Sequence, residues 1–221
     1  MTFDSQFLQL MLKGTLETLY MTLVSTALAY ILGVPIGIVL FTTAKDGIKP
    51  NPGVNSVLGV IVNVLRSVPF LILLVTVMPV TRFITGTTLG SSATIVPLVI
   101  AAAPFIGRMV EASLREVDSG VIEAGRSMGA STMQLIFRVL LPEAGPSLVS
   151  GAAIAVMTIL GYSAMAGFTG GGGLGSIATN YGYYRYETGI MLVTVALLVL
   201  IVQGLQSIGN GAARKIDKRG K

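Results

Sequence analysis

Long apolar runs alternate with short polar stretches along this chain of 221 residues. Several of the apolar runs approach or exceed the ~20 residues that an α-helix needs to cross a bilayer. The pattern therefore predicts an all-α membrane protein with five spans, preceded by a tail at residues 1–13 that is a candidate for lying along the membrane interface. The expected spans cover residues of about 16–41, 57–80, 92–110, 147–168 and 190–208.

One polar interruption, residues 118–142, has the pattern of a helix-turn-helix. Asp118 is a good N-cap for a first helix, and Gly129 suits the left-handed turn that would end it. Ser131–Gln134 matches a capping box that opens a second helix, in which apolar residues form a stripe. Pro142 is then the expected break before the fourth span.

Only 11% of the residues are charged, whereas an ordinary soluble domain has roughly 25%, and this agrees with a membrane protein. The distribution of the basic residues then predicts the orientation. With a cytoplasmic C-terminus and five spans, the N-terminus lies outside, and the basic residues are concentrated on the inner side, as membrane proteins prefer. The helix-turn-helix and a basic tail at 209–221 are then cytoplasmic. The inner residues are Lys45, Lys49, Arg108, Arg115, Arg126, Arg138 and five residues of the tail, against Lys13, Arg82 and Arg185 outside.

Several kinds of chemistry are excluded by the sequence. The chain has no Cys and no His, so disulfides, thiolate chemistry and imidazole catalysis are absent, and no metal site is predicted. No G-x-x-x-x-G-K-[ST] motif for ATP occurs, and the glycine-rich run at 170–175 follows a span rather than a βαβ unit, so we interpret it as a turn near the outer mouth. Residues 115–142 hold three basic and three acidic side chains, and this balance argues against DNA.

The helix-turn-helix carries a resemblance to a known family. Glu123-Ala124-Gly125, three residues, Gly129, nine residues and Val-Leu-Leu-Pro at 139–142 resemble the EAA loop of bacterial ABC importer permeases, with Gly and Val as mild departures. The resemblance implies a coupling helix that sits in a groove of a cytoplasmic ATPase, where small residues allow close approach and Glu123 offers a charge. The implied coupling residues are Glu123, Ala124, Gly125, Gly129, Leu141 and Pro142.

Further stretches, at 66–74, 103–111, 161–167 and 170–175, are similar to methionine importer permeases. The likeness runs from about residue 14 to residue 207, which would make 14–208 one transmembrane domain. It implies a homodimer in the bacterial inner membrane, two ATPase subunits that bind ATP and Mg, and an extracytoplasmic substrate-binding protein. This chain would be a transport subunit without cofactor or enzymatic activity, importing methionine or another small amino acid by alternating access.

Three residues are candidates for the translocation path. Arg66 is the only charge inside a predicted span, where a cation is costly, so it either packs within the permease near the path or reaches the cytoplasmic interface. Tyr162 and Met165 suit a flexible apolar constriction in the fourth span. Gly33-x-x-x-Gly37 is typical of close helix packing.

Three other functions remain open at this point. An ion-coupled carrier working alone would favour carboxylates inside the spans, but no acidic residue lies in the body of a predicted span, and the nearest, Glu17 and Glu111, lie at span ends. An intramembrane enzyme would need paired carboxylates, a His, or a Ser with a base. The third alternative is a structural membrane subunit.

Overall fold

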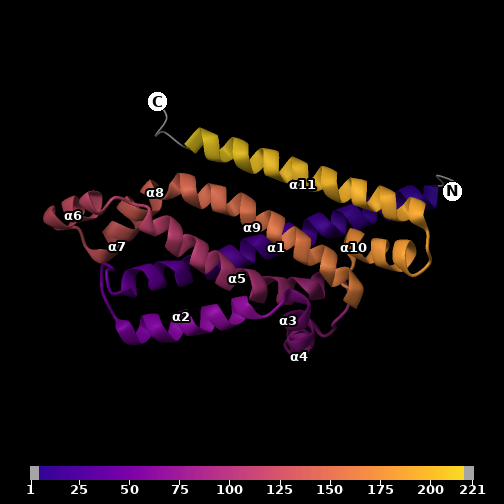
Figure 1. The fold of residues 1–221 in the computed structure, drawn as a ribbon, viewed down its shortest axis with the longest axis horizontal. Coiled ribbons are helices and arrows are strands. Elements are labelled where there is room, and N and C mark those ends of the chain that lie inside the picture. Colours follow the sequence, from indigo (N-terminus) through magenta and orange to yellow (C-terminus); the bar gives the residue numbers. More distant parts are fainter. Residues whose placement is uncertain (1–4, 217–221) are drawn as a thin grey trace. The chain divides into compact units, whose positions relative to one another are not determined.

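The computed structural model describes residues 5–216, which form helices joined by turns, without a β-strand in that range (Figure 1). Four helical segments are long and apolar enough to cross a membrane, and a bent pair of helices brings the number to five. The prediction of an all-α protein with several membrane spans is confirmed at this level. The long helices are α1 (Ser5–Thr43), α5 (Ser91–Arg115), α9 (Gly145–Ala166) and α11 (Thr188–Ile216).

The second predicted span is wrong as a single straight helix. The chain forms α2 (Pro52–Ser67) and α3 (Phe70–Thr76), separated by a break at residues 68–69, and then α4 (Met78–Thr85). Pro69 lies at the bend with a ψ of 137°, outside the helical region. Proline lacks a backbone N–H and disfavours helical geometry in the residue before it, so the apolar run is divided although its hydropathy is continuous.

The ends of the chain also differ from the sequence prediction. Residues from Ser5 onward are the first turns of α1, so the expected tail at 1–13 is helical and continuous with the first span as far as it is described. α11 extends to Ile216, and the expected basic tail at 209–221 is therefore helical over its first half. The remaining basic residues, Lys218, Arg219 and Lys221, lie outside the described residues.

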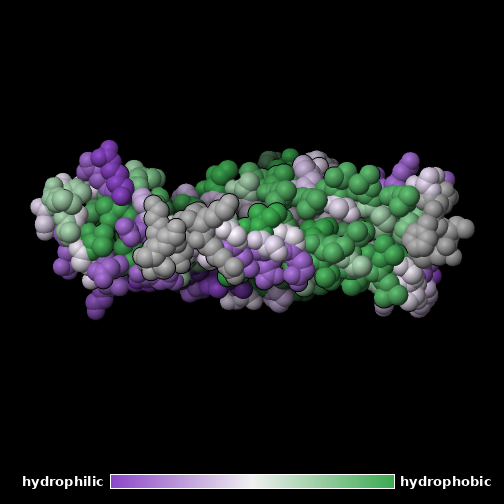
Figure 2. Space-filling model, turned by 90° about the horizontal axis from the view of Figure 1, so that it is seen from above, coloured by the Kyte–Doolittle hydropathy of each residue, from purple (hydrophilic) through white to green (hydrophobic). Residues whose placement is uncertain are grey.

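The contacts divide the chain into two units, and the boundaries fall within α1, α5, α9 and α11 and between α2 and α3. Unit 1 comprises residues 1–28, 68–102 and 156–206, and unit 2 comprises 29–67, 103–155 and 207–221. In unit 1, Figure 2 shows a broad apolar surface over the N-terminal part of α11, where the exposed residues include Leu192, Val195 and Leu200. Such a surface suits lipid rather than water.

The glycine-rich run of unit 1 is a fixed structure. It joins a 3-10 turn, η2 (Gly167–Thr169), to α10 (Gly173–Ile177), after which the chain continues as a π-helix, η3 (Ala178–Tyr183). Gly172 and Gly173 have φ of 83° and 71°, a region that favours glycine. The first amides of α10 donate to α1: Gly173 N to Glu17 Oε2 at 2.8 Å and Leu174 N to Thr18 Oγ1 at 2.9 Å. These bonds tie the run to α1.

Unit 2 is held together by close approach of α1 and α5. A Cβ atom on Gly33 would lie 2.7 Å from Ile106 Cγ2, and one on Gly37 would lie 2.6 Å from Val110 Cβ. Both glycines are thus needed for the contact, and the predicted Gly33-x-x-x-Gly37 packing is confirmed. Between α5 and α9 the chain forms α6 (Ser119–Ser127), α7 (Thr132–Gln134), a π-helix η1 (Leu135–Leu140) and α8 (Leu141–Glu143), which gather together in Figure 1.

Candidate functional site

The helix-turn-helix at residues 118–142 is built by local hydrogen bonds. Asp118 Oδ1 accepts from Gly120 N at 2.6 Å and caps α6. Gly129 has a φ of 79°, and Ala130 N donates to Gly125 O at 3.1 Å, so α6 ends in the left-handed turn that the glycine permits. The capping box is complete: Ser131 N donates to Gln134 Oε1 and Gln134 N to Ser131 Oγ. These three predictions are confirmed.

The second half of the segment differs from its prediction at Pro142. We expected a break at Pro142, but the chain stays helical through α8, and the only interruption before α9 is the single residue Ala144. The helix widens to a π-helix just before the proline, and Leu141 N donates to Ile136 O. The change from π-helical to α-helical bonding coincides with the residue that cannot donate, so the missing N–H does not stop the helix.

The two glycines of the predicted coupling site have different roles, one in packing within the segment and one in its turn. Gly125 is buried, and a Cβ there would lie 2.6 Å from Leu135 Cδ2 on the second helical stretch. Leu135, Ile136 and Leu140 are buried, as the apolar stripe indicated. Gly129 forms the turn, with no atom within 4 Å of a Cβ built on it. The expected open face shared by the two glycines is therefore absent, because Gly125 points into the hairpin.

The exposed surface of the segment is formed by other residues. Glu123 and Ala124 are exposed, and large apolar side chains stand beside them in the same segment, with Met128 82% and Phe137 56% exposed. Leu141 is half-buried and Pro142 exposed. The sequence carried a signal for this surface, because these apolar residues interrupt a polar segment and lie off the buried stripe. The exposed apolar set is Val121, Met128, Met133 and Phe137, which we call the apolar coupling surface.

Glu123 also borders a small groove between α6 and the loop that follows α1. The groove has a volume of about 130 Å³ and is lined by residues of the loop at 46–48 and by one side of α6. Arg126 Nη2 crosses its rim and donates to Ile48 O at 2.9 Å. Glu123 and Ala124, two of the exposed coupling residues, thus lie on a helix that is bonded to the rest of unit 2.

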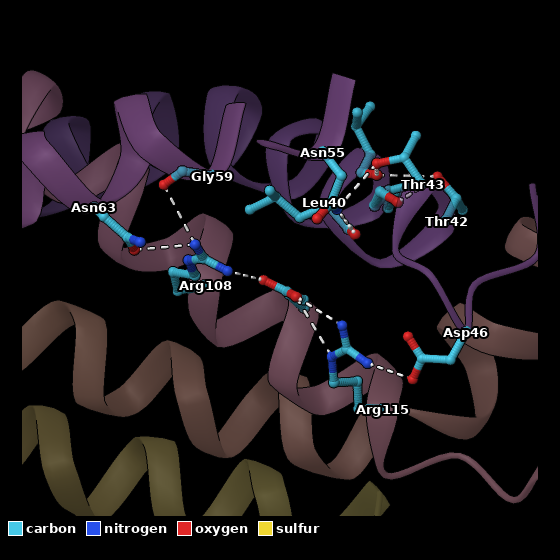
Figure 3. A network of polar contacts seen from close by, with 12 residues as sticks. Leu40, Thr42, Thr43, Asp46, Asn55, Gly59, Asn63, Arg108 and Arg115 are labelled. Carbon is cyan, nitrogen blue, oxygen red and sulfur yellow. Dashed lines mark hydrogen bonds and ion pairs between the residues drawn. The ribbon is translucent and has the colours of Figure 1, made fainter. Parts of the chain in front are cut away.

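A polar network links that same loop to α5 and α2 (Figure 3). The Glu111 carboxylate of α5, which is buried, accepts from Arg108 Nη1 at 2.7 Å and from Arg115 Nη2 at 3.1 Å. Arg115 Nη1 also donates to Asp46 Oδ2 at 2.9 Å, and Arg108 Nη2 donates to Asn63 Oδ1 of α2 at 3.0 Å. Sequence reasoning did not single out this network.

The three candidates for the translocation path have different surroundings. Arg66 lies in the last turn of α2, exposed, just before the bend, so it does not sit inside a straight span. In unit 1, Tyr162 stacks on Phe70 with ring centroids 4.5 Å apart and planes 3° from parallel. Met165 is 44% exposed and lines an apolar cavity of about 300 Å³ together with Met191. Among the described residues no group of three or more acidic side chains could hold a metal ion.

Comparison with known proteins places the chain in a family. The profile of the family described as "Binding-protein-dependent transport system inner membrane component" matches residues 33–219. The "Probable D-methionine transport system permease protein MetI" of Vibrio cholerae is 49% identical over 210 residues, covering 95% of this chain and 93% of the relative. The "Methionine import system permease protein MetP" of Bacillus subtilis is 44% identical over 207 residues, covering 94% of this chain and 93% of the relative.

A solved structure agrees with these sequence relatives. A chain of the "MetNI methionine ABC transporter", in an inward-facing conformation, superposes with a TM-score of 0.96 at 45% identity, covering 97% of this chain and all of the other. The family match spans most of the chain, and the relatives match over nearly their whole length. The chain belongs to the family of binding-protein-dependent transport system inner membrane components, the multi-pass permease subunits of bacterial ABC importers.

Proposed function

We propose that this chain forms the membrane path of an ATP-driven importer for methionine, and that residues 118–142 dock it to a separate ATPase. The observation that carries the proposal is the apolar coupling surface, whose exposed side chains belong to the same segment as Glu123. Exposed methionine and phenylalanine side chains on a charged segment outside the long apolar helices are expected to be covered by a protein partner.

The proposed assembly includes a separate ATPase, because transport against a gradient needs a source of energy. The sequence contains no nucleotide-binding loop, so ATP and Mg would bind to two copies of a partner ATPase, one for each permease copy in a homodimer. This chain would then have no enzymatic activity and no cofactor of its own. An extracytoplasmic binding protein would deliver the substrate, lipid would cover the apolar helices, and nucleic acid would have no role.

The orientation that we propose keeps the N-terminus outside and the C-terminus in the cytoplasm. The distribution of Lys and Arg supports it, because the basic residues gather around the coupling segment and the end of α11. Residues 14–208 would act as the transmembrane domain. The coupling segment then faces the cytoplasm, on the side where ATP is available.

The residues that line the path are proposed on their surroundings. Met165 borders an apolar cavity with Met191, and flexible thioethers adapt to an apolar substrate side chain. Tyr162 is held in place by its stack on Phe70, and the stacked pair would form a fixed part of the wall of the translocation path. Arg66, at the bend between α2 and α3, would pack against protein or water in the assembled permease rather than against lipid.

Retention of the ATPase tests the docking role. Replacing Glu123 by Arg places a cation at the coupling surface, and it should lower the amount of ATPase that co-purifies with tagged permease by about tenfold or more. Glu187→Arg is the matched control, because this exposed glutamate lies in the loop before α11, on the outer side in the proposed orientation. Equal retention in the Glu123→Arg and Glu187→Arg complexes would contradict the docking role.

Uptake tests the substrate. The complete importer in proteoliposomes, with its binding protein outside and ATP inside, should accumulate labelled L- or D-methionine, and unlabelled methionine should compete better than other small amino acids. Uptake driven by an ion gradient without the ATPase would instead favour a secondary carrier. Stronger competition by a different amino acid than by methionine, with the ATPase retained, would leave the importer role intact and refute methionine as the substrate.

A further inference from the structure

The network in Figure 3 has a buried centre and two arms that reach different parts of unit 2. At the centre, the Glu111 side chain is only 9% exposed and contacts two guanidinium groups, Arg108 at 2.7 Å and Arg115 at 3.1 Å. Removing a partner from a buried ion pair leaves an uncompensated charge and is strongly destabilising. Glu111 therefore fixes the positions of two arginines that lie one turn to either side of it on α5.

The first arm runs from α5 to α2. Arg108 Nη2 donates to Asn63 Oδ1 at 3.0 Å and lies 3.4 Å from the carbonyl oxygen of Gly59. A Cβ on Gly59 would lie 3.5 Å from Arg108 Nη2, an ordinary van der Waals distance, so the guanidinium lies close against α2 at this turn. Since Arg108 is held from the other side by Glu111, the arm sets the position of α2 against α5.

The second arm runs from α5 to the loop at 44–51, which joins α1 to α2. Arg115 Nη1 donates to Asp46 of this loop at 2.9 Å. The loop keeps its shape through backbone bonds from Gly47 N to Ala44 O and from Lys49 N to Thr42 O, both 2.9 Å long. A displacement at one point of the loop would therefore move the whole loop.

The coupling helix α6 is attached to that same loop. Arg126, three residues after Glu123, donates from Nη2 to Ile48 O at 2.9 Å. Its acceptor lies two residues beyond Asp46 in the chain. Contacts therefore run without a gap from α6 through the loop to Arg115, then through Glu111 and Arg108 to α2, and all of them lie within unit 2.

We propose that this network, which we call the Glu111 network, transmits the movement of the coupling helix α6 to α2, and that Glu111 is its positioning residue. The proposal rests on the proposed docking of an ATPase on α6. Its centre and its arm to the loop differ in a way that suits this role. The Asp46 carboxylate is 73% exposed and can exchange partners during a movement, whereas the Glu111 carboxylate is buried and keeps α5 and its arginines together.

A purely structural role would make a different prediction. If the network only stabilised the fold, its loss would lower thermal stability and assembly together, and every transporter that did assemble would import as much per ATP as the wild type. If the network transmits movement, the assembled complex would still bind the ATPase and hydrolyse ATP, but less of that hydrolysis would result in import. The ratio of substrate imported to ATP hydrolysed separates the two roles.

The experiment uses the complete complex in proteoliposomes with its binding protein and methionine. Glu111→Gln removes the charge that holds both arginines, and Asn63→Ala removes the α2 end while leaving the buried carboxylate in place. The matched control is Lys45→Gln, since Lys45 is exposed and adjacent to Asp46 in the same loop. We expect Glu111→Gln to lower import per ATP by roughly 5–10-fold, Asn63→Ala by about 2–3-fold, and Lys45→Gln to have no effect.

The double variant supplies a further criterion. Because both substitutions interrupt one chain of contacts, Glu111→Gln with Asn63→Ala should lower the ratio no further than Glu111→Gln alone. An unchanged ratio of import to ATP hydrolysis in both single variants would overturn the proposal. So would a fall in import by Glu111→Gln that is fully explained by the smaller amount of ATPase bound to the complex. If Glu111→Gln fails to fold, an unchanged ratio in Asn63→Ala overturns it. A wild-type complex that retains no ATPase would refute the proposed function itself.

Discussion

Gly175 is a position where a single added methyl group is expected to be strongly destabilising. It is buried in α10, and a Cβ there would lie 2.8 Å from Ala164 Cα and 2.9 Å from Ala164 C. These are backbone atoms of α9, which cannot rotate away as the end of a side chain can. Since carbon atoms pack at roughly 3.5–4.0 Å, Gly175→Ala requires α10 to move by about 1 Å.

The cost of this movement follows from what holds α10. Overpacking a tight contact costs about 1–3 kcal/mol. The shift also strains the bonds from Gly173 N to Glu17 and from Leu174 N to Thr18, and losing a hydrogen bond to a charged acceptor costs about 1.5–3 kcal/mol. We therefore expect Gly175→Ala to lower the free energy of unfolding by roughly 3–5 kcal/mol, at the upper end for a point substitution.

Far-UV circular dichroism of the purified subunit in mixed micelles, titrated with sodium dodecyl sulfate, measures this change. The chain has no tryptophan, so helix content is a better probe than intrinsic fluorescence. Gly161→Ala and Gly204→Ala are matched controls, because nothing lies within 4 Å of a Cβ at either helical position. Alanine should stabilise these helices by up to about 1 kcal/mol. The reasoning fails if Gly175→Ala unfolds at the same detergent fraction as these controls.

Two smaller effects are expected elsewhere. Ser131→Ala removes half of the capping box and should cost about 1 kcal/mol, seen as faster amide exchange at Gln134 and unchanged exchange in α9. Phe70→Leu keeps an apolar side chain but removes the stack on Tyr162, which should cost about 0.5–1.5 kcal/mol in the same detergent titration. An unchanged stability would show that the stacking of the two rings does not stabilise the subunit.

Local chemistry made the coupling segment predictable. Asp118, Gly129 and the Ser131–Gln134 pair each act within a few residues of their own position, so their caps and turn could be derived from sequence and are present in the structure. The predicted second span ran through Pro69, a residue able to bend a helix, for the opposite reason. Hydropathy adds over a window of residues, so it measures whether a segment prefers lipid and is insensitive to one absent hydrogen-bond donor.

The exposed surface and the network depend on tertiary structure. The apolar stripe predicted the burial of Leu135 and Ile136 and did not include Phe137, but how far Phe137 is exposed depends on how the π-helical stretch packs against α6. The spacing of Arg108, Glu111 and Arg115 fits pairing along one helix face. Their partners in α2 and in the loop could not be derived from that spacing, because they depend on how α5 packs.

The inward direction of Gly125 determines how force can leave α6. One side of the helix rests on Leu135, because the glycine allows a contact that a larger residue would block. A second contact, from Arg126 to Ile48, joins α6 to the loop at 44–51. Glu123, Ala124 and Met128 remain exposed. A partner that pushes on this exposed side therefore acts on the hairpin through packing and on α5 and α2 through the loop. Gly125 thus contributes to the packing of α6 within the hairpin more than to the contact between α6 and the ATPase.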